Sequence, residues 1–403
     1  MQSTIQFLSP KSHHTNDIAL TALPPLSLYV HIPWCVHKCP YCDFNSHELA
    51  KAADDWETPY VDALIADLES VLPQVWGRRL SSIFIGGGTP SVLSERAMDT
   101  LLAAVRARLP QISEMEITME ANPGTLDVEK LKGFREAGVT RLSLGVQSFD
   151  DALLSRIGRI HTADQAKHAL AQAYRLFPKV NLDLMFALPQ QSMAQLQADV
   201  ATALSFAPTH LSYYHLTIEP NTLFHRHPPV VPDDELALDM QDFIQAELAA
   251  KGLRHYEVSA YAQPNHECQH NTNYWQFGDY IGIGAGAHAK ISQHDRIVRT
   301  VKFKHPQRYL DGIAQGNAVE TEQYLSRAEL PFEYMLNALR LRDGTTLAQM
   351  QMACGLSVVD LEPALSQAQS KGLMVQDADV LRVTDLGWRF LSDVQAMFLK
   401  DND

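Results

Sequence analysis

Short apolar runs rich in β-branched residues alternate with longer segments of helical periodicity through the first half of the chain. This alternation is typical of parallel β/α architecture, in which each helix carries the chain back to the start of the next strand. The runs predict six strands, at residues 26–32, 82–86, 115–121, 139–146, 179–187 and 209–218. Six units fall short of the eight of a closed barrel, so we expect an α/β fold with a partial (β/α)6 barrel.

The segments between these runs carry helix start and stop signals. Ser94, Asp127 and Thr162 each precede a helical pattern, and their side chains can accept hydrogen bonds from its first backbone N–H groups. Gly138 follows the second of these patterns, where a left-handed residue commonly ends a helix. We therefore expect long helical connections, as parallel neighbouring strands require.

The hydrophobic pattern changes near residue 226, where the Pro-rich and acidic stretch HRHPPVVPDDE lies. An amphipathic helix is expected at residues 235–251, and a hairpin pattern, VQDADVLRVTDLG, lies near the end of the chain. We expect four parts: a polar N-terminal tail at 1–25, the barrel at 26–225, an accessory α+β segment at 226–320, and a small helical, winged-helix-like domain at 321–403.

The composition limits what these parts can bind. A chain of 403 residues, 46% of them hydrophobic, can bury a sizeable core. Its formal net charge of −14 disfavours a nucleic-acid partner, which needs a basic surface. No apolar run approaches the roughly 18 residues of a membrane span, and the first residues lack the pattern of a signal peptide. We therefore expect a cytoplasmic protein, at most peripheral at the inner membrane.

Three of the five cysteines lie close together, directly after the first predicted strand. Cys35, Cys39 and Cys42 have the spacing C-x3-C-x2-C, and a reducing compartment would keep them as thiols or metal ligands. Structural zinc and an iron–sulfur cubane both want four ligands, but a cubane held by three thiolates leaves one iron open to another molecule. A chance cluster, or a zinc site completed by His37 or His47, is the alternative.

Glycine and polar residues occur at the ends of successive predicted strands. A triple glycine and a threonine follow the second strand, a carboxylate and an amide end the third, an amide ends the fourth, and the fifth contains a carboxylate. These residues are Gly86, Gly87, Gly88, Thr89, Glu120, Asn122, Gln147 and Asp183. Ligands bind at the carboxyl ends of strands in parallel β/α folds, so we expect a binding site there. For each residue alone, a bare turn or a satisfied structural polar group is the alternative.

The cysteine spacing, with the aromatic Tyr41 before the last thiol, and the wider match YVHIPWC...CPYCDFNSH resemble the radical S-adenosylmethionine (SAM) superfamily. The resemblance is strongest to the subgroup of oxygen-independent coproporphyrinogen III oxidase and its haem-chaperone relatives. It implies a [4Fe-4S] cluster on Cys35, Cys39 and Cys42, with SAM bound to the open iron. In that superfamily an electron from the cluster cleaves SAM to a 5′-deoxyadenosyl radical, and the protein positions both cofactors.

The resemblance also implies which residues contact SAM. Tyr29, Gly87 and Glu120 match positions that contact the cluster-bound SAM. A further group matches the environment of a second SAM seen in the oxidase, and it comprises Tyr41, Gly88, Thr89, Gln147, Arg159 and Asp183. The prediction is therefore one SAM site beside the cluster, and a second one if the chain follows the oxidase in this respect.

One residue of the cysteine loop departs from the oxidase pattern. The oxidase continues C-x3-C-x2-C-x-C, whereas Phe44 occupies the last of these positions here. A phenyl ring cannot take over the redox, proton or ligand role of a thiol. The departure disfavours a true coproporphyrinogen oxidase and favours the haem-chaperone relatives.

The segment HNTNYW, residues 270–275, also resembles the haem-chaperone relatives, which carry an HNxxYW element. Histidine is a common ligand of haem iron, and Tyr and Trp offer flat faces for a porphyrin. The candidates for haem contact are His270, Asn271, Tyr274 and Trp275. The alternatives are a polar loop with an aromatic anchor, and adventitious metal binding by His266, Cys268 and His270, which would share one face of a strand.

A basic run follows this segment and suits the carboxylates of a porphyrin, although a solvated surface is the alternative. It comprises Arg296, Arg299, Lys302, Lys304 and Arg308. Together these features predict a haem chaperone with a [4Fe-4S] cluster and SAM, which passes haem to acceptor haemoproteins, including respiratory, membrane-associated ones. The alternatives are a SAM-dependent porphyrinogen oxidase and a plain electron carrier. A homodimer is also considered, although no heptad pattern supports it.

Overall fold

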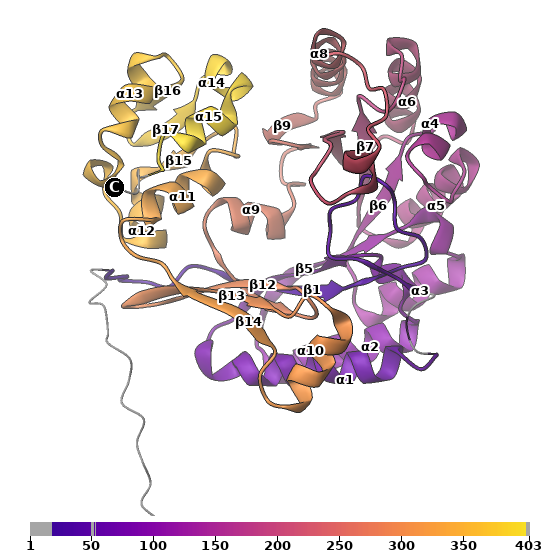
Figure 1. The fold of residues 1–403 in the computed structure, drawn as a ribbon, viewed down its shortest axis with the longest axis horizontal. Helices are drawn as coiled ribbons and strands as arrows, with labels where there is room; N and C mark the ends of the chain where they lie inside the picture. Colours follow the sequence, from indigo (N-terminus) through magenta and orange to yellow (C-terminus); the bar gives the residue numbers. More distant parts are fainter. Residues whose placement is uncertain (1–17, 50–51, 53, 400–403) are drawn as a thin grey trace, which may run out of the picture.

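The computed structural model describes residues 18–49, 52 and 54–399, and one twelve-stranded mixed sheet forms its centre (Figure 1). Seven neighbouring strands are parallel, in the order β11, β1, β4, β5, β6, β7, β8. Their bounds are β1 Leu26–Ile32, β4 Leu80–Gly87, β5 Gln111–Ala121, β6 Arg141–Gln147, β7 Lys179–Phe186, β8 His210–His215 and β11 Asp279–Ile283. Within the described residues the outermost strands of the sheet do not pair with each other, which confirms the partial barrel.

The six predicted strands are all present, and β11 is an addition to them. It comes from the glycine-rich stretch of the accessory segment and pairs in parallel with β1. Gly282 is required there, because a Cβ atom at this position would lie 1.9 Å from the carbonyl oxygen of His288. The accessory segment therefore supplies a strand beside the first strand of the barrel.

Antiparallel strands extend both edges of the parallel region. One edge carries β10 and then β9, and the other carries β12, β13 and β14. Their bounds are β9 Arg254–Glu257, β10 Ala260–Ala262, β12 His288–Gln293, β13 Arg296–Lys302 and β14 Val319–Tyr324. The sheet thus runs across the boundary predicted near residue 226, and the division into four domains stays a prediction.

Helices cover the outer side of the barrel strands (Figure 1). They are α1 Glu57–Val71, α2 Glu95–Arg108, α3 Val128–Ala137, α4 Asp151–Arg156, α5 Ala163–Leu176, α6 Met193–Ser205, α8 Asp234–Ala250 and α10 Pro306–Ala314. The short helix α7, Leu223–Arg226, lies instead beside the cysteine loop, where the N–H of Phe224 donates to the carbonyl oxygen of Pro40 at 2.9 Å. The predicted caps are confirmed: the side chains of Ser94, Asp127 and Thr162 accept hydrogen bonds from backbone N–H groups of the first turn. Gly138 ends α3 in the left-handed conformation.

Side-chain alternation along β1 separates the core from the inner face of the barrel. Leu26, Leu28, Val30 and Ile32 are buried in the main hydrophobic core. The intervening positions are polar, and their side chains hydrogen-bond to other groups of the inner face. The same two-residue period places Glu120 and Asp183 among these inward-facing polar groups.

The segment between β10 and β11 forms the short helix α9, Gln269–Trp275, and lies against β1, β4 and β11. The hypothesis that His266, Cys268 and His270 share one face of a strand is therefore wrong, because the last of these residues already belongs to the helix. Within residues 18–49, 52 and 54–399, no helix has the length and apolar character needed to span a bilayer.

The C-terminal part of the chain has its own small sheet and hydrophobic core. Its elements are α11 Leu330–Ala338, β15 Thr345–Thr346, α12 Leu347–Cys354, α13 Ala364–Ser370, β16 Met374–Asp377, β17 Val380–Val383, α14 Asp385–Arg389 and α15 Leu391–Ala396. The predicted hairpin is β16 and β17. Ile18 and Leu20 are buried in this core, so the expected polar tail is packed at these positions, while residues 1–17 lie outside the described part.

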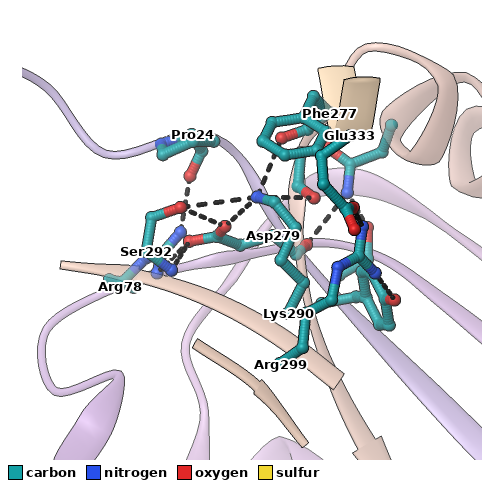
Figure 2. A network of polar contacts seen from close by, with 12 residues as sticks. Pro24, Arg78, Phe277, Asp279, Lys290, Ser292, Arg299 and Glu333 are labelled. Atoms are coloured by element: carbon teal, nitrogen blue, oxygen red, sulfur yellow. Dashed lines mark hydrogen bonds and ion pairs between the residues drawn. The ribbon is translucent and has the colours of Figure 1, made fainter. Parts of the chain in front are cut away.

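A buried polar network connects β11 to the segment before β1 and to the C-terminal unit (Figure 2). The carboxylate of Asp279 accepts hydrogen bonds from Arg78 at 2.8 Å and from Lys290 at 2.7 Å. Lys290 also donates to the carbonyl oxygen of Phe277 at 3.0 Å, and Arg299 pairs with Glu333 of α11. Arg299, from β13, also donates to the hydroxyl oxygen of Tyr280 in β11 at 3.4 Å and so links the seventh strand to the C-terminal unit.

Candidate functional site

The cysteine loop begins where β1 ends and is held by a small parallel pair of strands, β2 Trp34–Cys35 and β3 His47–Glu48. His31, near the end of β1, hydrogen-bonds through Nε2 to the carbonyl oxygen of Asn45 at 2.8 Å, which fixes the far side of the loop. The backbone N–H of Cys42 donates to the carbonyl oxygen of Cys39 at 3.2 Å, so these two thiols lie on one tight turn.

The glycine-rich end of β4 supports the first cysteine. Gly88 passes so close to the loop that a Cβ atom there would lie 2.7 Å from the carbonyl oxygen of Trp34 and 3.0 Å from Sγ of Cys35. The hydroxyl of Thr89 donates to the same sulfur at 3.3 Å. A hydrogen-bond donor directed at a sulfur favours the thiolate form, which is the form that binds iron. Gly88 and Thr89 therefore contact the cysteine loop itself.

The donor set fits a [4Fe-4S] cluster better than a single metal ion. In the described ranges, no group of three His, Cys, Asp or Glu side chains converges as the ligands of one ion, which disfavours a zinc site completed by His37 or His47. Each thiolate of a cubane binds a different iron, so the three sulfurs need not converge on one point. Cys35, Cys39 and Cys42 all lie on this one loop, as a three-thiolate cluster requires.

A cavity of about 600 Å³ opens beside the loop, on the inner face of the barrel. Tyr29, Gly87 and Glu120, the three residues expected at the cluster-bound SAM, all line it together with Cys42. The backbone N–H of Gly87 donates to Oε2 of Glu120 at 3.1 Å. The structure therefore brings the expected SAM contacts and one cluster thiol to the same cavity.

Glu120 is held in an unusual protonation state by its surroundings. Enclosure in the barrel and the neighbouring carboxylate of Asp183 raise its pKa to about 8, against a smaller lowering by the N–H of Gly87. A carboxyl group of this pKa is mostly neutral at pH 7 in the free protein. A ligand with an N–H donor or a positive charge would restore the carboxylate, and the amino group and sulfonium of SAM provide both.

Of the residues expected at a second SAM, Tyr41, Gln147 and Arg159 lie near one another and near Cys39. Arg159 donates to the carbonyl oxygen of Gly145 at 2.6 Å and lies 3.8 Å from Sγ of Cys39. Burial raises the pKa of Tyr41, which interacts with Arg159, and Gln147 has a positive φ of 69° at the end of β6. Asp183 differs from the others, because it has several hydrogen bonds of its own.

The carboxylate of Asp183 accepts hydrogen bonds from Ser143 at 2.6 Å and from Asn181 at 2.8 Å. Asn181 in turn contacts His210, whose ring lies 2.9 Å from the hydroxyl oxygen of Tyr256. This chain of contacts corresponds to the satisfied structural role that was the alternative for a carboxylate inside a strand. A contact between Asp183 and SAM stays a prediction.

The side chains of the HNxxYW element differ in burial. His270 is 2% exposed, and its ring lies among those of Tyr29, Phe84 and Tyr274, at centroid distances of 6.4, 5.0 and 5.0 Å. Burial lowers the pKa of His270 to about 3, so the ring is neutral. Asn271 and Trp275 are half-buried.

The outer side of this helix touches the C-terminal unit. The guanidinium of Arg340 lies over the indole ring of Trp275, 4.2 Å from the ring centroid. Arg340 is not part of any motif described for the sequence, and it was not predicted as a site residue. The pairing with Trp275 could not be found from sequence, because 65 positions separate the two residues.

The basic run is mostly engaged with carboxylates. Lys302 is 3% exposed and pairs with Asp67 of α1 at 2.6 Å, so its assignment to a carboxylate-binding surface is wrong. Its side chain points into the core because β13 alternates like any strand. Arg299 pairs with Glu333, and Arg308 lies 3.8 Å from Glu320. Lys304 is the member of the run that lines the cavity beside the cysteine loop.

Several residues of this cavity were not among the expected SAM contacts, although Tyr274 was expected at haem and Lys304 in the basic run. His31, Lys38, Asn45, Tyr274, His288 and Lys304 all line the cavity. The signal for His31 was its place in β1, two residues after Tyr29 and on the same face. His288 and Lys304 come from chain segments far from the cysteines, so only the three-dimensional structure brings them to the cavity.

Comparisons with known proteins agree with this geometry. Residues 29–203 match the model of the radical SAM superfamily, and residues 325–390 match that of the HemN C-terminal domain. The solved structure of the radical SAM enzyme coproporphyrinogen III oxidase (HemN) from Escherichia coli is similar to this chain with a TM-score of 0.79, over 96% of each chain. Its 21% sequence identity makes this a likeness of fold.

Sequence relatives extend over almost the whole chain. The protein named heme chaperone HemW from Escherichia coli is 46% identical, over 95% of this chain and 100% of its own length. The proteins of the same name from Haemophilus influenzae and Bacillus subtilis are 42% and 35% identical, over 94% and 93% of this chain and 99% of their own length. This chain therefore belongs to the HemW family, within the radical SAM superfamily.

Proposed function

We propose that this protein is a haem chaperone, which binds haem and passes it to acceptor haemoproteins. The observation that carries the proposal is the 46% identity to the Escherichia coli heme chaperone HemW over 100% of that protein's length. Phe44 supports it, since the thiol that the oxidase pattern places at this position is absent. Haem is the cargo in this proposal, whereas the [4Fe-4S] cluster and SAM are resident cofactors.

Cys35, Cys39 and Cys42 hold the cluster, and SAM occupies the cavity that Tyr29, Gly87 and Glu120 line. When bound together, these cofactors can supply one-electron chemistry. The chain's own residues orient SAM: the glycine-rich end of β4 lets backbone groups approach it closely, and Glu120 accepts an N–H from its amino group. Thr89 keeps its hydrogen bond to Cys35, which supports the thiolate.

The residues expected at a second SAM give the proposal a second, separable part. Tyr41, Gly88, Thr89, Gln147, Arg159 and Asp183 form the environment in which a second SAM would bind. The guanidinium of Arg159 would meet the carboxylate of that molecule. Equilibrium dialysis with the reconstituted protein decides this part, because a second site requires a limiting stoichiometry of two SAM per chain.

Haem is placed at the outer side of the HNxxYW element. Trp275 offers an indole ring, one face of which Arg340 covers, and Asn271 offers a polar side chain; both residues are half-buried rather than enclosed. The acceptor is proposed to be a haemoprotein of the respiratory chain, met at the cytoplasmic surface of the inner membrane. A homodimer is the assembly proposed for the loaded protein, and sedimentation with and without SAM tests it.

The test starts from protein whose cluster has been reconstituted without oxygen. Stoichiometric haem should give a Soret band, and coproporphyrinogen III with SAM and a reductant should give no protoporphyrinogen. Formation of that product would replace the chaperone proposal with the alternative, a radical SAM oxidase. Absence of any haem complex would also reject the proposal. Cys35→Ala is the control for the cluster, and it should lose the visible absorption of the iron–sulfur group.

A further inference from the structure

The helix α9 carries two residues of the HNxxYW element to the inner face of the barrel. Tyr274 lines the 600 Å³ cavity together with Tyr29, Gly87 and Glu120. His270, one turn earlier on the helix, contacts the ring of Tyr274 at a centroid distance of 5.0 Å. Tyr274 therefore belongs to the wall of the cavity and His270 lies directly behind it, whereas haem was expected at the element as a whole.

Both residues are fixed by neighbours from the barrel strands. The ring of Tyr274 packs on Tyr280 of β11 at a centroid distance of 4.2 Å. The Nδ1 atom of His270 lies 3.3 Å from the hydroxyl oxygen of Ser82 on β4, and its ring also contacts Phe84 of that strand. Rings held from two sides in this way provide a rigid wall for a ligand.

Iron ligation by His270 conflicts with this environment. The side chain is enclosed by Tyr29, Phe84 and Tyr274, and its Nδ1 atom already has a partner. Its Nε2 atom has no hydrogen-bond partner among the described residues, but it is buried where a porphyrin, which is larger than any of the surrounding rings, has no access. Haem could reach this atom only if α9 left the barrel.

We propose that Tyr274 is a SAM-binding residue and that His270 positions Tyr274 and Tyr29 in the wall of the SAM cavity, so that neither contacts haem. The inference rests on the proposed function for the identity of the ligand. The two faces of the HNxxYW element then have different ligands. His270 and Tyr274, on the inner face, serve SAM binding, and Trp275, on the outer face, contacts haem. Loss of the Tyr274 ring removes an aromatic contact and opens the cavity wall to water.

The experiment measures two ligands on the same variants. The dissociation constant of SAM is measured by equilibrium dialysis on reconstituted protein, and haem binding by Soret titration. Tyr274→Ala and His270→Leu should each raise the SAM constant by about tenfold or more, with haem stoichiometry and Soret position unchanged. Tyr274→Phe keeps the ring and should stay within about twofold of the wild type. Gln276→Ala is the matched control, because that side chain is exposed at the end of the same helix.

Visible absorption of the cluster and the thermal midpoint show that each variant is folded, and Tyr274→Leu replaces Tyr274→Ala if the latter is not. An unchanged SAM constant in the folded Ala or Leu variant would overturn the inference. So would a His270→Leu protein that binds SAM normally but has lost haem or shifted the Soret band. If the wild type binds SAM but not haem, the proposed function fails, and the SAM measurements still decide the role of Tyr274.

Discussion

Glu120 shows how one residue can link SAM binding to pH. Its pKa of about 8 means that the free protein carries a neutral carboxyl group at pH 7. The sulfonium and amino group of SAM favour the carboxylate, so binding should expel this proton. Affinity for SAM should therefore rise between pH 6 and pH 7.5, by at most about tenfold per pH unit for one proton.

Calorimetry in buffers of different ionisation enthalpy measures the protons released on SAM binding. Glu120→Gln should release close to one proton fewer than the wild type at pH 7, and its affinity should depend less on pH. Any proton lost by the amino group of SAM itself is common to both proteins and cancels in the comparison. Equal proton release from the two proteins would show that Glu120 does not ionise when SAM binds.

Gly87 is the second residue whose local geometry leads to a prediction. It has a φ of +115°, and a Cβ atom there would lie 2.6 Å from the ring of His31. That ring cannot move away easily, because it is hydrogen-bonded to Tyr29 at 2.9 Å and to Asn45 at 2.8 Å. Gly87→Ala should therefore lower the free energy of unfolding by about 2–5 kcal/mol, through backbone strain and overpacking together.

Chemical denaturation of Gly87→Ala checks this value, and Gly252→Ala separates its two causes. Gly252 also has a positive φ, of +78°, but has nothing within 4 Å of the added methyl group. The control variant should lose only the backbone part, about 1–2 kcal/mol. If both variants lost the same free energy of unfolding, the ring of His31 would have moved away from the new methyl group at no cost in stability.

At the scale of elements, β11 depends on a buried charge. Asp279 has a fully buried side chain and compensates Lys290, which is 2% exposed, and Arg78. Asp279→Ala should lower the free energy of unfolding by about 3–5 kcal/mol, because it leaves the ammonium of Lys290 without its counter-charge. The double variant Asp279→Leu with Lys290→Met should be more stable than the single variant, since the buried ammonium is removed together with its counter-charge. Arg78, which is 12% exposed, keeps its hydrogen bond to Pro24.

Acid sensitivity gives an independent test of the same element. Burial alone would raise the pKa of Asp279, but Lys290 and Arg78 outweigh it and hold the pKa below its ordinary value. The ionised Asp279 therefore contributes its full stabilisation above the pKa of an unfolded aspartate, about 3.9. This stabilisation is lost as the pH falls through the lower pKa that Asp279 has in the folded protein. The wild type should lose more stability than the double variant between pH 5 and pH 3, as measured by urea denaturation; parallel curves would contradict the assignment.

The elements that were predicted and those that were not differ in a physical way. The strands β1 and β4–β8 carry regular apolar patterns, and their helices carry caps, so local sequence is sufficient for them. The strand β11 is short and rich in glycine, and α9 is built from the polar letters HNTNYW. What stabilises α9 is contact with Tyr29, Phe84 and Tyr280, and such long-range contacts leave no local pattern.

The same distinction applies to the site. The three cysteines were found because they are neighbours in the sequence, and Glu120 because the ends of parallel strands meet at one edge. His288 and Lys304 reach the cavity by the path of the accessory segment, for which the sequence has no comparable rule. The expected role of His270 in haem binding came from the resemblance alone, and the burial of its ring points instead to the SAM cavity.

For the whole molecule, the C-terminal unit contacts strands near both ends of the open sheet. On one side Glu257 of β9 forms a bridge with Leu341, and the N–H of Arg342 donates to the carbonyl oxygen of Tyr256 at 2.9 Å. On the other side Arg299 of β13 pairs with Glu333. The C-terminal unit therefore spans the gap that six β/α units leave, with α9 between it and the barrel (Figure 1).

Phe277 is the apolar centre of this attachment. It is 1% exposed, lies under the ammonium of Lys290 at 4.2 Å from the ring centroid, and packs edge-on against Tyr334 of α11. Phe277→Ala should remove packing interactions that contribute about 3–5 kcal/mol to stability. Most of this loss should weaken the attachment of the C-terminal unit rather than the barrel.

Limited proteolysis of Phe277→Ala should then cut between β14 and α11 and release a C-terminal fragment while the cluster absorption persists. Phe390→Ala, at a ring that is 51% exposed, is the matched control and should resist the protease like the wild type. Loss of the cluster in step with the first cut would show instead that barrel and C-terminal unit unfold as one cooperative body.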